Sequence, residues 1–428
     1  MIDEIYDAFI DCNQQITTDT RKINKNDLFF ALRGPTFNGN SFTHKALKKG
    51  AKYAVIDDEN YFIEGKTFLV DDVLNSLQKL ALIHRRKINI PVIAITGTNG
   101  KTTTKELIGS VLNTKFNVLI TKGNLNNHIG VPLTILKIQN QHQIAVIEMG
   151  ASKKGDIKEL VEIALPNYGI ITNIGKAHLA GFGNIETIQK TKLELYDYII
   201  KSKGEIILNK DDSLLFDYLP STLTKHTYGH NLSDLVGKLI NQDPFLEIEI
   251  KSKKNKEIIN THLLGSYNLN NVLAAVSFGQ IFGLGLKNIS NAISKYKPNN
   301  NRSQLIKTKN NIIIADCYNA NPTSTLEALK SFKNLKNENK LVILGDMLEL
   351  GEVEDEEHQF IVNYLKNNNI KSFLVGKCYQ KTVSNFKCFE STEQIIDFIK
   401  SENYTDYIVL LKGSRGIQLE SIINENIL

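Results

Sequence analysis

The sequence predicts an α/β protein of three domains: a small α/β N-terminal domain, a central domain with a mostly parallel, doubly wound sheet, and a C-terminal α/β domain. Short apolar runs rich in β-branched residues alternate with stretches of helical spacing along most of the chain. This alternation is typical of parallel sheets covered by helices. A chain of 428 residues is also too long for a single hydrophobic core. We expect the domains at residues 1–88, 89–297 and 298–428.

The composition excludes several classes of function. Apolar residues make up 42% and charged residues 23%, the values of a soluble globular chain. A net charge of +5 is too small at this length to indicate a nucleic-acid-binding surface. No apolar run reaches membrane-spanning length, and the first residues are acidic, unlike a secretory signal. The four cysteines are scattered and have no spacing typical of a metal site or a redox pair. We therefore expect a cytoplasmic monomer with no nucleic-acid partner and no membrane insertion.

The first domain is expected to contain short strands joined by helices. Residues 27–32 and 53–56 are apolar runs of strand length, and a turn-rich loop at 33–40 follows the first of them. Helical spacing is found at 43–49 and again at 74–86.

The central domain begins with a pattern that binds phosphate. Residues 92–95 form a buried-strand pattern, a glycine-rich polar loop follows, and helical spacing begins at Lys105. Glycines let backbone N–H groups approach an anion, and the helix dipole favours it. Lys101 adds a positive charge and Thr102 a hydroxyl for Mg²⁺. The full P-loop pattern has a glycine where this chain has Ile95, so the P-loop-type prediction rests on context, and a glycine-rich turn with a surface lysine is the alternative.

The rest of the central domain continues the alternation of strand and helix. A β-hairpin at about 245–264 is expected to interrupt it. Ligands of such sheets bind at the carboxyl ends of the strands, where the polar clusters of this chain fall. The expected strands are 117–120, 144–147, 168–172 and 205–208, and the expected helices are 156–164, 185–200, 268–282 and 286–296.

Three residues beyond the loop are candidate metal ligands. Glu148 ends a buried strand, where an acid commonly holds Mg²⁺; a solvated carboxylate is the alternative. His178 follows the next strand on the same sheet edge, although a lone histidine is more often structural. Lys192 lies on a predicted helix. As an ammonium it would repel a metal ion, but a lysine carbamylated by CO₂ presents a carboxylate; an ordinary surface lysine is the alternative.

The third domain is predicted as a second, Rossmann-like α/β series. Asp316, Asp346 and Lys412 each follow a predicted strand. Carboxylates could hold the amine of a zwitterionic small molecule and a lysine its carboxylate. Helix caps and solvated loop charges are the alternative. The expected strands are 312–315, 341–344, 372–375 and 407–411.

Three motifs resemble those of the Mur ligase family. Residues 96–103 (TGTNGKTT) are similar to the ATP loop of the family, which tolerates the missing first glycine. Residues 173–179 and 265–271 are similar to two further family motifs. The order and spacing of the motifs match over essentially the whole chain.

Within that family, the last domain is similar to the member that adds D-alanyl-D-alanine to UDP-N-acetylmuramoyl-tripeptide. The similarity lies in residues 316–324 and 345–351, and residues 37–39 and 123–127 agree with it. The Asp-Asn-Pro-Arg motif typical of the diamino-acid-adding relative is absent from the sequence.

The resemblance implies an ATP-dependent amide-bond ligase of peptidoglycan precursor synthesis, working through an acyl phosphate with ATP and two Mg²⁺ ions. Lys101, Glu148, His178 and Lys192 are implied to be catalytic. The implied ATP-binding residues are Gly97, Thr98, Asn99, Gly100, Lys101, Thr102, Thr103, Asn268, Asn271, Arg302 and Asp316. The implied metal ligands are Thr102, Glu148, His178 and carbamylated Lys192. The implied substrate-binding residues are Thr20, Arg21, Asn38, Gly39, Thr121, Asn124, Asn126, Asn127, Asn319, Asn321, Asp346 and Lys412.

Rival interpretations remain open on the sequence. The nearest are another Mur-type ligase and a folylpolyglutamate synthase, which would share the ATP loop but not residues 316–324. A P-loop nucleotide switch or motor would need an element that couples to an effector, and no sequence pattern indicates one. A sugar-nucleotide-binding regulator without activity is disfavoured by the intact Lys101, Thr102 and Glu148.

Overall fold

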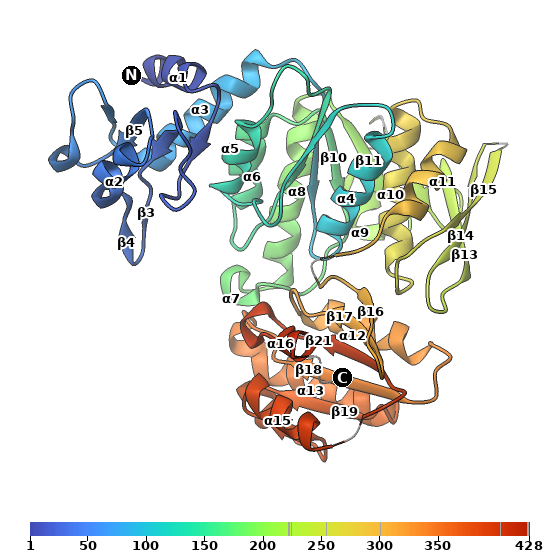
Figure 1. The fold of residues 1–428 in the computed structure, drawn as a ribbon. Coiled ribbons are helices and arrows are strands. Elements are labelled where there is room, and N and C mark those ends of the chain that lie inside the picture. Colours follow the sequence, from blue (N-terminus) through green and yellow to red (C-terminus); the bar gives the residue numbers. More distant parts are fainter. Residues whose placement is uncertain (221–222, 224, 254, 300, 403, 426–427) are drawn as a thin grey trace.

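Three larger sheets follow one another along the chain in the computed structural model, and β3 (Arg33–Gly34) and β4 (Phe37–Asn38) form a small two-stranded sheet in the first domain (Figure 1). The structure describes residues 1–220, 223, 225–253, 255–299, 301–402, 404–425 and 428. The predicted three-part α/β architecture is confirmed. Within the part of the chain that the structure describes, no helix combines the length and the apolar character needed to cross a membrane.

The first sheet is small and parallel, with the strand order β1-β2-β5-β6. The predicted helix at 74–86 is α3, which packs on α1 of its own domain and on α5 (Gly130–Ile135) and α6 (Asp156–Ala164) of the central domain. Sequence reasoning missed α1, which buries Ile5, Ala8 and Phe9 at helical spacing. The elements are α1 (Ile2–Asp11), β1 (Ile16–Thr17), β2 (Leu28–Phe30), β3 (Arg33–Gly34), β4 (Phe37–Asn38), α2 (Thr43–Lys48), β5 (Tyr53–Ile56), β6 (Thr67–Leu69) and α3 (Val73–Lys87).

The central sheet has nine strands in the order β15-β14-β13-β12-β11-β10-β7-β9-β8. The strands from β8 to β13 pair in parallel, and β14 and β15 add antiparallel to them. The predicted β-hairpin is present as β14 and β15, which follow one another with no helix between them. Strand β13, which sequence reasoning missed, pairs with both β12 and β14 and joins the hairpin to the sheet. Lys254, in the expected turn, lies outside the described residues. The strands are β7 (Val92–Thr96), β8 (Val118–Ile120), β9 (Ile144–Glu148), β10 (Tyr168–Ile171), β11 (Glu205–Asn209), β12 (Lys225–Gly229), β13 (Leu235–Asn241), β14 (Glu247–Ser252) and β15 (Asn255–Asn260).

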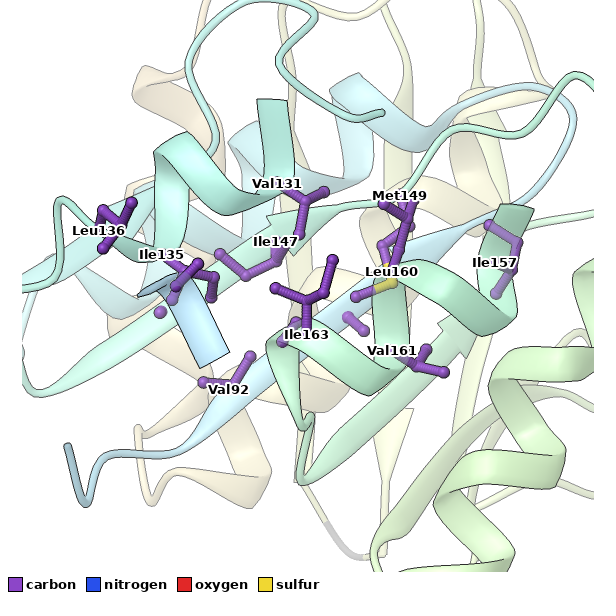
Figure 2. Packing of buried hydrophobic residues seen from close by; sticks show 14 of the residues in the cluster. Val92, Val131, Ile135, Leu136, Ile147, Met149, Ile157, Leu160, Val161 and Ile163 are labelled. Carbon is purple, nitrogen blue, oxygen red and sulfur yellow. The ribbon is translucent and has the colours of Figure 1, made fainter. Parts of the chain in front are cut away.

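Side-chain alternation on β7 explains how both faces of this sheet are covered. Val92 and Ala94 belong to the hydrophobic cluster under α5, α6 and α8, whereas Ile93 and Ile95 belong to the cluster under α4, α10 and α11. Figure 2 shows the first cluster, where side chains of α5 and α6 meet those of β7 and β9. The central helices are α4 (Lys101–Leu112), α5 (Gly130–Ile135), α6 (Asp156–Ala164), α7 (Leu179–Phe182), α8 (Ile185–Lys201), α9 (Ser213–Tyr218), α10 (Asn268–Ile281) and α11 (Leu286–Lys295).

The third sheet has the order β16-β17-β21-β18-β19-β20, parallel except for β16. This domain lies below the central domain in Figure 1, and α7 reaches towards it. Its elements are β16 (Gln304–Lys307), β17 (Ile312–Asp316), α12 (Pro322–Lys333), β18 (Lys340–Gly345), α13 (Glu354–Asn367), β19 (Ser372–Val375), α14 (Lys377–Gln380), β20 (Lys387–Phe389), α15 (Thr392–Ser401), β21 (Ile408–Lys412) and α16 (Ser421–Asn424).

Candidate active site between the central and C-terminal domains

The loop after β7 is built so that only glycine fits at two positions. Gly97 has φ +140°, and a β-carbon there would lie 2.0 Å from Oγ1 of Thr172. Gly100 has φ +80°, and a β-carbon there would lie 2.6 Å from Oδ1 of Asn271. Helix α4 begins at Lys101, one turn before the predicted start at Lys105. Lys101 and Thr102 are therefore on the first helical turn, where free N–H groups and the dipole favour an anion.

The Lys101 side chain folds back over this loop. Its ammonium donates to the carbonyl oxygens of Gly97, at 2.6 Å, and Thr98, at 2.8 Å. Burial lowers the pKa of Lys101 to about 8, with Arg302 adding to the shift and Glu148 opposing it. The charge thus lies at the loop and lines the cavity, where it would favour a bound phosphate group.

Glu148, at the end of β9, is the centre of a buried polar network. Its carboxylate accepts from Thr102 Oγ1 at 2.9 Å and from Asn126 Nδ2 at 2.8 Å, and it pairs with Lys105 Nζ at 3.2 Å. Burial would raise the pKa of Glu148, but the ammonium groups of Lys105 and Lys101 outweigh it and hold that pKa below its usual value. The carboxylate is therefore ionised. Together with the Thr102 hydroxyl it offers the oxygen ligands that Mg²⁺ prefers.

The other two predicted metal ligands are His178 and Lys192. His178 follows β10 and lines the cavity, and burial, with Lys101 and Lys192 nearby, lowers its pKa in spite of the opposing Glu349. Lys192, on α8, is 3% exposed, and its ammonium lies 5.9 Å from the ring centre of Phe182. Burial, with the charge of Lys101, lowers its pKa well below the usual value. The expectation of an ordinary surface lysine at this position is wrong.

A cavity of about 1070 Å³ lies between the phosphate loop and the C-terminal domain. The two sides are joined by a hydrogen bond of 2.8 Å from Asn321 Nδ2, at the N-terminus of α12, to Asn99 Oδ1 in the loop. Of the predicted site residues, those lining this cavity are Thr98, Asn99, Gly100, Lys101, Thr102, Thr103, Asn126, Asn127, Glu148, His178, Asn268, Asn271, Arg302, Asp316, Asn319, Asn321 and Lys412.

On the C-terminal side, Asp316 holds two neighbours in place. Its carboxylate accepts from Lys412 Nζ at 2.8 Å and from the backbone N–H of Ser303 at 3.1 Å. The Ser303 hydroxyl lies 2.8 Å from the Tyr267 hydroxyl. The charge of Lys412 is thus neutralised within the domain. Arg302 also lines the cavity, has no ion pair among the residues that the structure describes, and stacks its guanidinium 3.7 Å from the ring centre of Tyr318.

Several predicted ligands lie outside the cavity lining. Asp346 is buried, and its carboxylate accepts the N–H groups of Cys378 and Tyr379 at the start of α14, as a helix cap does. Thr121 accepts the N–H of Glu148 at 3.0 Å and so positions the strand end. Gly97, Asn124 and Lys192 also lie outside that lining.

The residues predicted to bind the sugar nucleotide lie in the first domain, away from this cavity. Asn38 accepts from the N–H of Asn40 at 3.0 Å, and the backbone at Gly39 packs so tightly that a β-carbon would lie 2.2 Å from the Leu32 carbonyl oxygen. Arg21 is exposed and pairs with Asp19 at 2.9 Å; Thr20 is beside it. Their role in binding stays a prediction.

Among the charged residues that sequence reasoning missed are two that contact predicted metal ligands. Lys105 reaches Glu148 because it lies one helical turn beyond Lys101, a spacing that would have indicated the contact had the helix start been placed correctly. Glu349, in a C-terminal-domain loop, contacts His178 across the domain boundary. Separated by 171 residues, this pair leaves no local signal in the sequence.

A phosphate loop, an ionised acid at the next strand end and a second α/β domain facing them define a multidomain P-loop nucleotide-binding enzyme. Family models match three successive parts of the chain: the Mur ligase family catalytic domain at residues 14–95, the Mur ligase middle domain at 95–279, and the Mur ligase glutamate ligase domain at 301–415. The chain belongs to the Mur ligase family.

Several proteins and solved structures are similar to this chain over almost its whole length. The UDP-N-acetylmuramoyl-tripeptide–D-alanyl-D-alanine ligase of Bacillus subtilis is 35% identical, with 96% of this chain and 92% of that protein covered. The crystal structure of MurF from Acinetobacter baumannii superposes with a TM-score of 0.88 at 28% identity, covering 96% and 93% of the two chains. The MurF ligase of Thermotoga maritima, in complex with ADP, has a TM-score of 0.87 at 25% identity, covering 97% of each chain.

Proposed function

We propose that this chain is an ATP-dependent ligase that joins D-alanyl-D-alanine to UDP-N-acetylmuramoyl-tripeptide, forming an amide bond, ADP and phosphate. The observation that carries the proposal is the cavity shared by the phosphate loop and the C-terminal domain, bridged by Asn99 and Asn321. Relatives that match over nearly the whole chain carry the name of this activity. ATP and an amino-bearing substrate can therefore meet at one place.

The first step would be transfer of the γ-phosphoryl group to the tripeptide carboxylate, giving an acyl phosphate and ADP. Negative charge develops on the phosphoryl oxygens, and a fixed cation stabilises it most effectively where water is excluded. The Lys101 ammonium contacts the loop, and the free N–H groups of the first turn of α4, which begins at Lys101, also favour an anion there. The dipeptide amine would then attack the acyl carbon, and phosphate would leave with the C–O bond electrons.

Magnesium would be held by Thr102 and Glu148, and a second ion by His178 and carbamylated Lys192. The Thr102 hydroxyl and the ionised Glu148 carboxylate, 2.9 Å apart, form an oxygen pair that suits a hard cation. When bound, Mg²⁺ neutralises triphosphate charge. Asn126, bonded to the other carboxylate oxygen at 2.8 Å, keeps the Glu148 group in one orientation.

Lys192→Ala is expected to lower turnover by about 10²-fold, and a short carboxylic acid such as acetate is expected to restore part of it. The buried amine of Lys192 has a pKa well below its usual value, so its neutral form can react with CO₂ to give a carboxylate. Steady-state rates with and without acetate measure the effect. Lys190→Ala, an exposed lysine on the same helix, is the matched control. A fully active Lys192→Ala enzyme would refute the carbamate.

The substrate assignment is tested by measuring ADP release while each substrate is omitted in turn. Sustained release should require both the tripeptide nucleotide and D-alanyl-D-alanine, with a product heavier than the nucleotide by the dipeptide less one water. Equal activity with a folate and glutamate would instead support a folylpolyglutamate synthase. No activity with the dipeptide but activity with single amino acids would indicate another Mur-type ligase.

A further inference from the structure

One contact across the domain boundary has no part in the steps above. His178 Nδ1 contacts Oε2 of Glu349, which lies in the loop after β18 of the C-terminal domain. Both residues have left-handed backbones, with φ +51° at His178 and +67° at Glu349. This conformation is costly for residues other than glycine and persists where the surrounding structure holds it.

The loop that carries Glu349 is fixed on both sides. The Ala180 N–H donates to the Glu349 carbonyl oxygen at 3.1 Å, and a β-carbon on Gly351 would lie 3.1 Å from Cα of Ala180. On the other side, the N–H of Leu348 donates to Ser414 Oγ at 2.9 Å. The backbone of Glu349 is therefore held by α7 and by its own domain at once.

Apolar and charged contacts also hold the C-terminal domain against α7 and the loop after β10. Leu179 and Phe182 of α7 share one hydrophobic cluster with Met347 and Leu350 of the loop. Lys176, in the loop after β10, pairs with Glu357 at 2.5 Å. The position of the Glu349 carboxylate therefore depends on docking of the whole C-terminal domain.

The chemistry of the pair determines which imidazole nitrogen carries the proton. An ionised carboxylate can only accept hydrogen bonds, so Nδ1 of His178 must be the donor. In the neutral ring the lone pair then belongs to Nε2. Among the described residues no hydrogen bond to Nε2 of His178 is found, and His178 lines the cavity.

We propose that Glu349 is a positioning residue that fixes the Nδ1–H tautomer of His178 and so presents Nε2 to a metal ion in the cavity. A carboxylate commonly orients a metal-binding histidine in this way. Because Glu349 comes from the C-terminal domain, docking of that domain completes the metal site. The proposal rests on the proposed function for the presence of a metal, while the tautomer itself can be measured without substrate.

The tautomer is tested by nitrogen-15 NMR of histidine-labelled, nucleotide-free protein at about pH 8, where an ordinary imidazole is neutral. His178→Gln identifies the His178 signals. The wild type should show a protonated Nδ1 and an unprotonated Nε2, and Glu349→Ala should shift the proton towards Nε2. Glu352→Ala, an exposed acid in the short 3-10 helix (Gly351–Val353) just after Glu349, should leave the spectrum unchanged. An unchanged His178 tautomer in Glu349→Ala would overturn the proposal whether or not the ligase activity is correct.

Metal affinity provides the second readout. Titration of Mn²⁺ into the ADP-bound protein, followed by electron paramagnetic resonance, should show binding weakened about 10–100-fold in Glu349→Ala. Glu352→Ala should bind as the wild type does. The Glu349 side chain is 61% exposed, so its removal leaves the core intact. Wild-type affinity in Glu349→Ala, or equal loss in both variants, would overturn the proposal.

Discussion

Lys101→Ala should reduce turnover by about 10³-fold or more, with the fold unchanged. The ammonium folds over the phosphate loop and lies 2.6 Å and 2.8 Å from two of its carbonyl oxygens. Without it, charge that develops during phosphoryl transfer has no cation at that point. Steady-state ADP release and a circular dichroism melt measure activity and folding separately.

Lys101→Ala is also expected to change how the binding of an ATP analogue depends on pH. Because the pKa of Lys101 is lowered to about 8, its ammonium is present below that pH and lost above it. Binding of a non-hydrolysable ATP analogue should weaken as pH rises through about 8 in the wild type, and this step should vanish in Lys101→Ala. Lys154→Ala, an exposed lysine in the neighbouring loop, is the charge-matched control. Wild-type turnover in Lys101→Ala would contradict the phosphate role.

Glu148→Gln is expected to abolish measurable ligation and to destabilise the fold. Lys105 is 1% exposed, and Glu148 is its ion-pair partner. Leaving a buried charge without its partner costs about 3–5 kcal/mol. Loss of the carboxylate also removes the charged oxygen beside Thr102, so the catalytic loss should be about 10²-fold or more. Denaturant unfolding and turnover are measured on the same preparation.

A second substitution separates these two effects. In Glu148→Gln/Lys105→Met the unpaired charge is gone, so much of the lost free energy of unfolding should return while ligation stays absent. Lys105→Met alone leaves the Glu148 carboxylate without its closest cation and should also destabilise the fold. Recovery of turnover in the double variant would show that Glu148 acts only through stability, against its assignment as a metal ligand.

The phosphate loop and Glu148 could be predicted because their signals are local. An apolar β-branched run followed by glycine and polar residues indicates a buried strand that ends at a ligand edge. Gly97 and Gly100 are required at that edge by close neighbours. The start of α4 was harder to place, because threonine is a weak helix former and three of them open the helix.

Contacts between distant segments could not be predicted. The Glu349–His178 pair depends on how two domains dock, and no spacing rule reports it. Asp346 and Lys412 stand at strand ends, as ligands do, but a helix N-terminus takes the first and Asp316 neutralises the second. The position of a charge at a strand end therefore does not by itself predict whether its hydrogen bonds go to a ligand or to neighbouring groups of the protein.

In the proposed mechanism, phosphate passes from ATP to the tripeptide carboxylate before the amide forms. Tripeptide nucleotide labelled with oxygen-18 in that carboxylate tests it directly, with the released phosphate analysed by mass spectrometry. Collapse of an acyl phosphate leaves one carboxylate oxygen on phosphorus, so one labelled oxygen should enter each phosphate per amide formed. Amide formation with unlabelled phosphate would contradict the proposed mechanism.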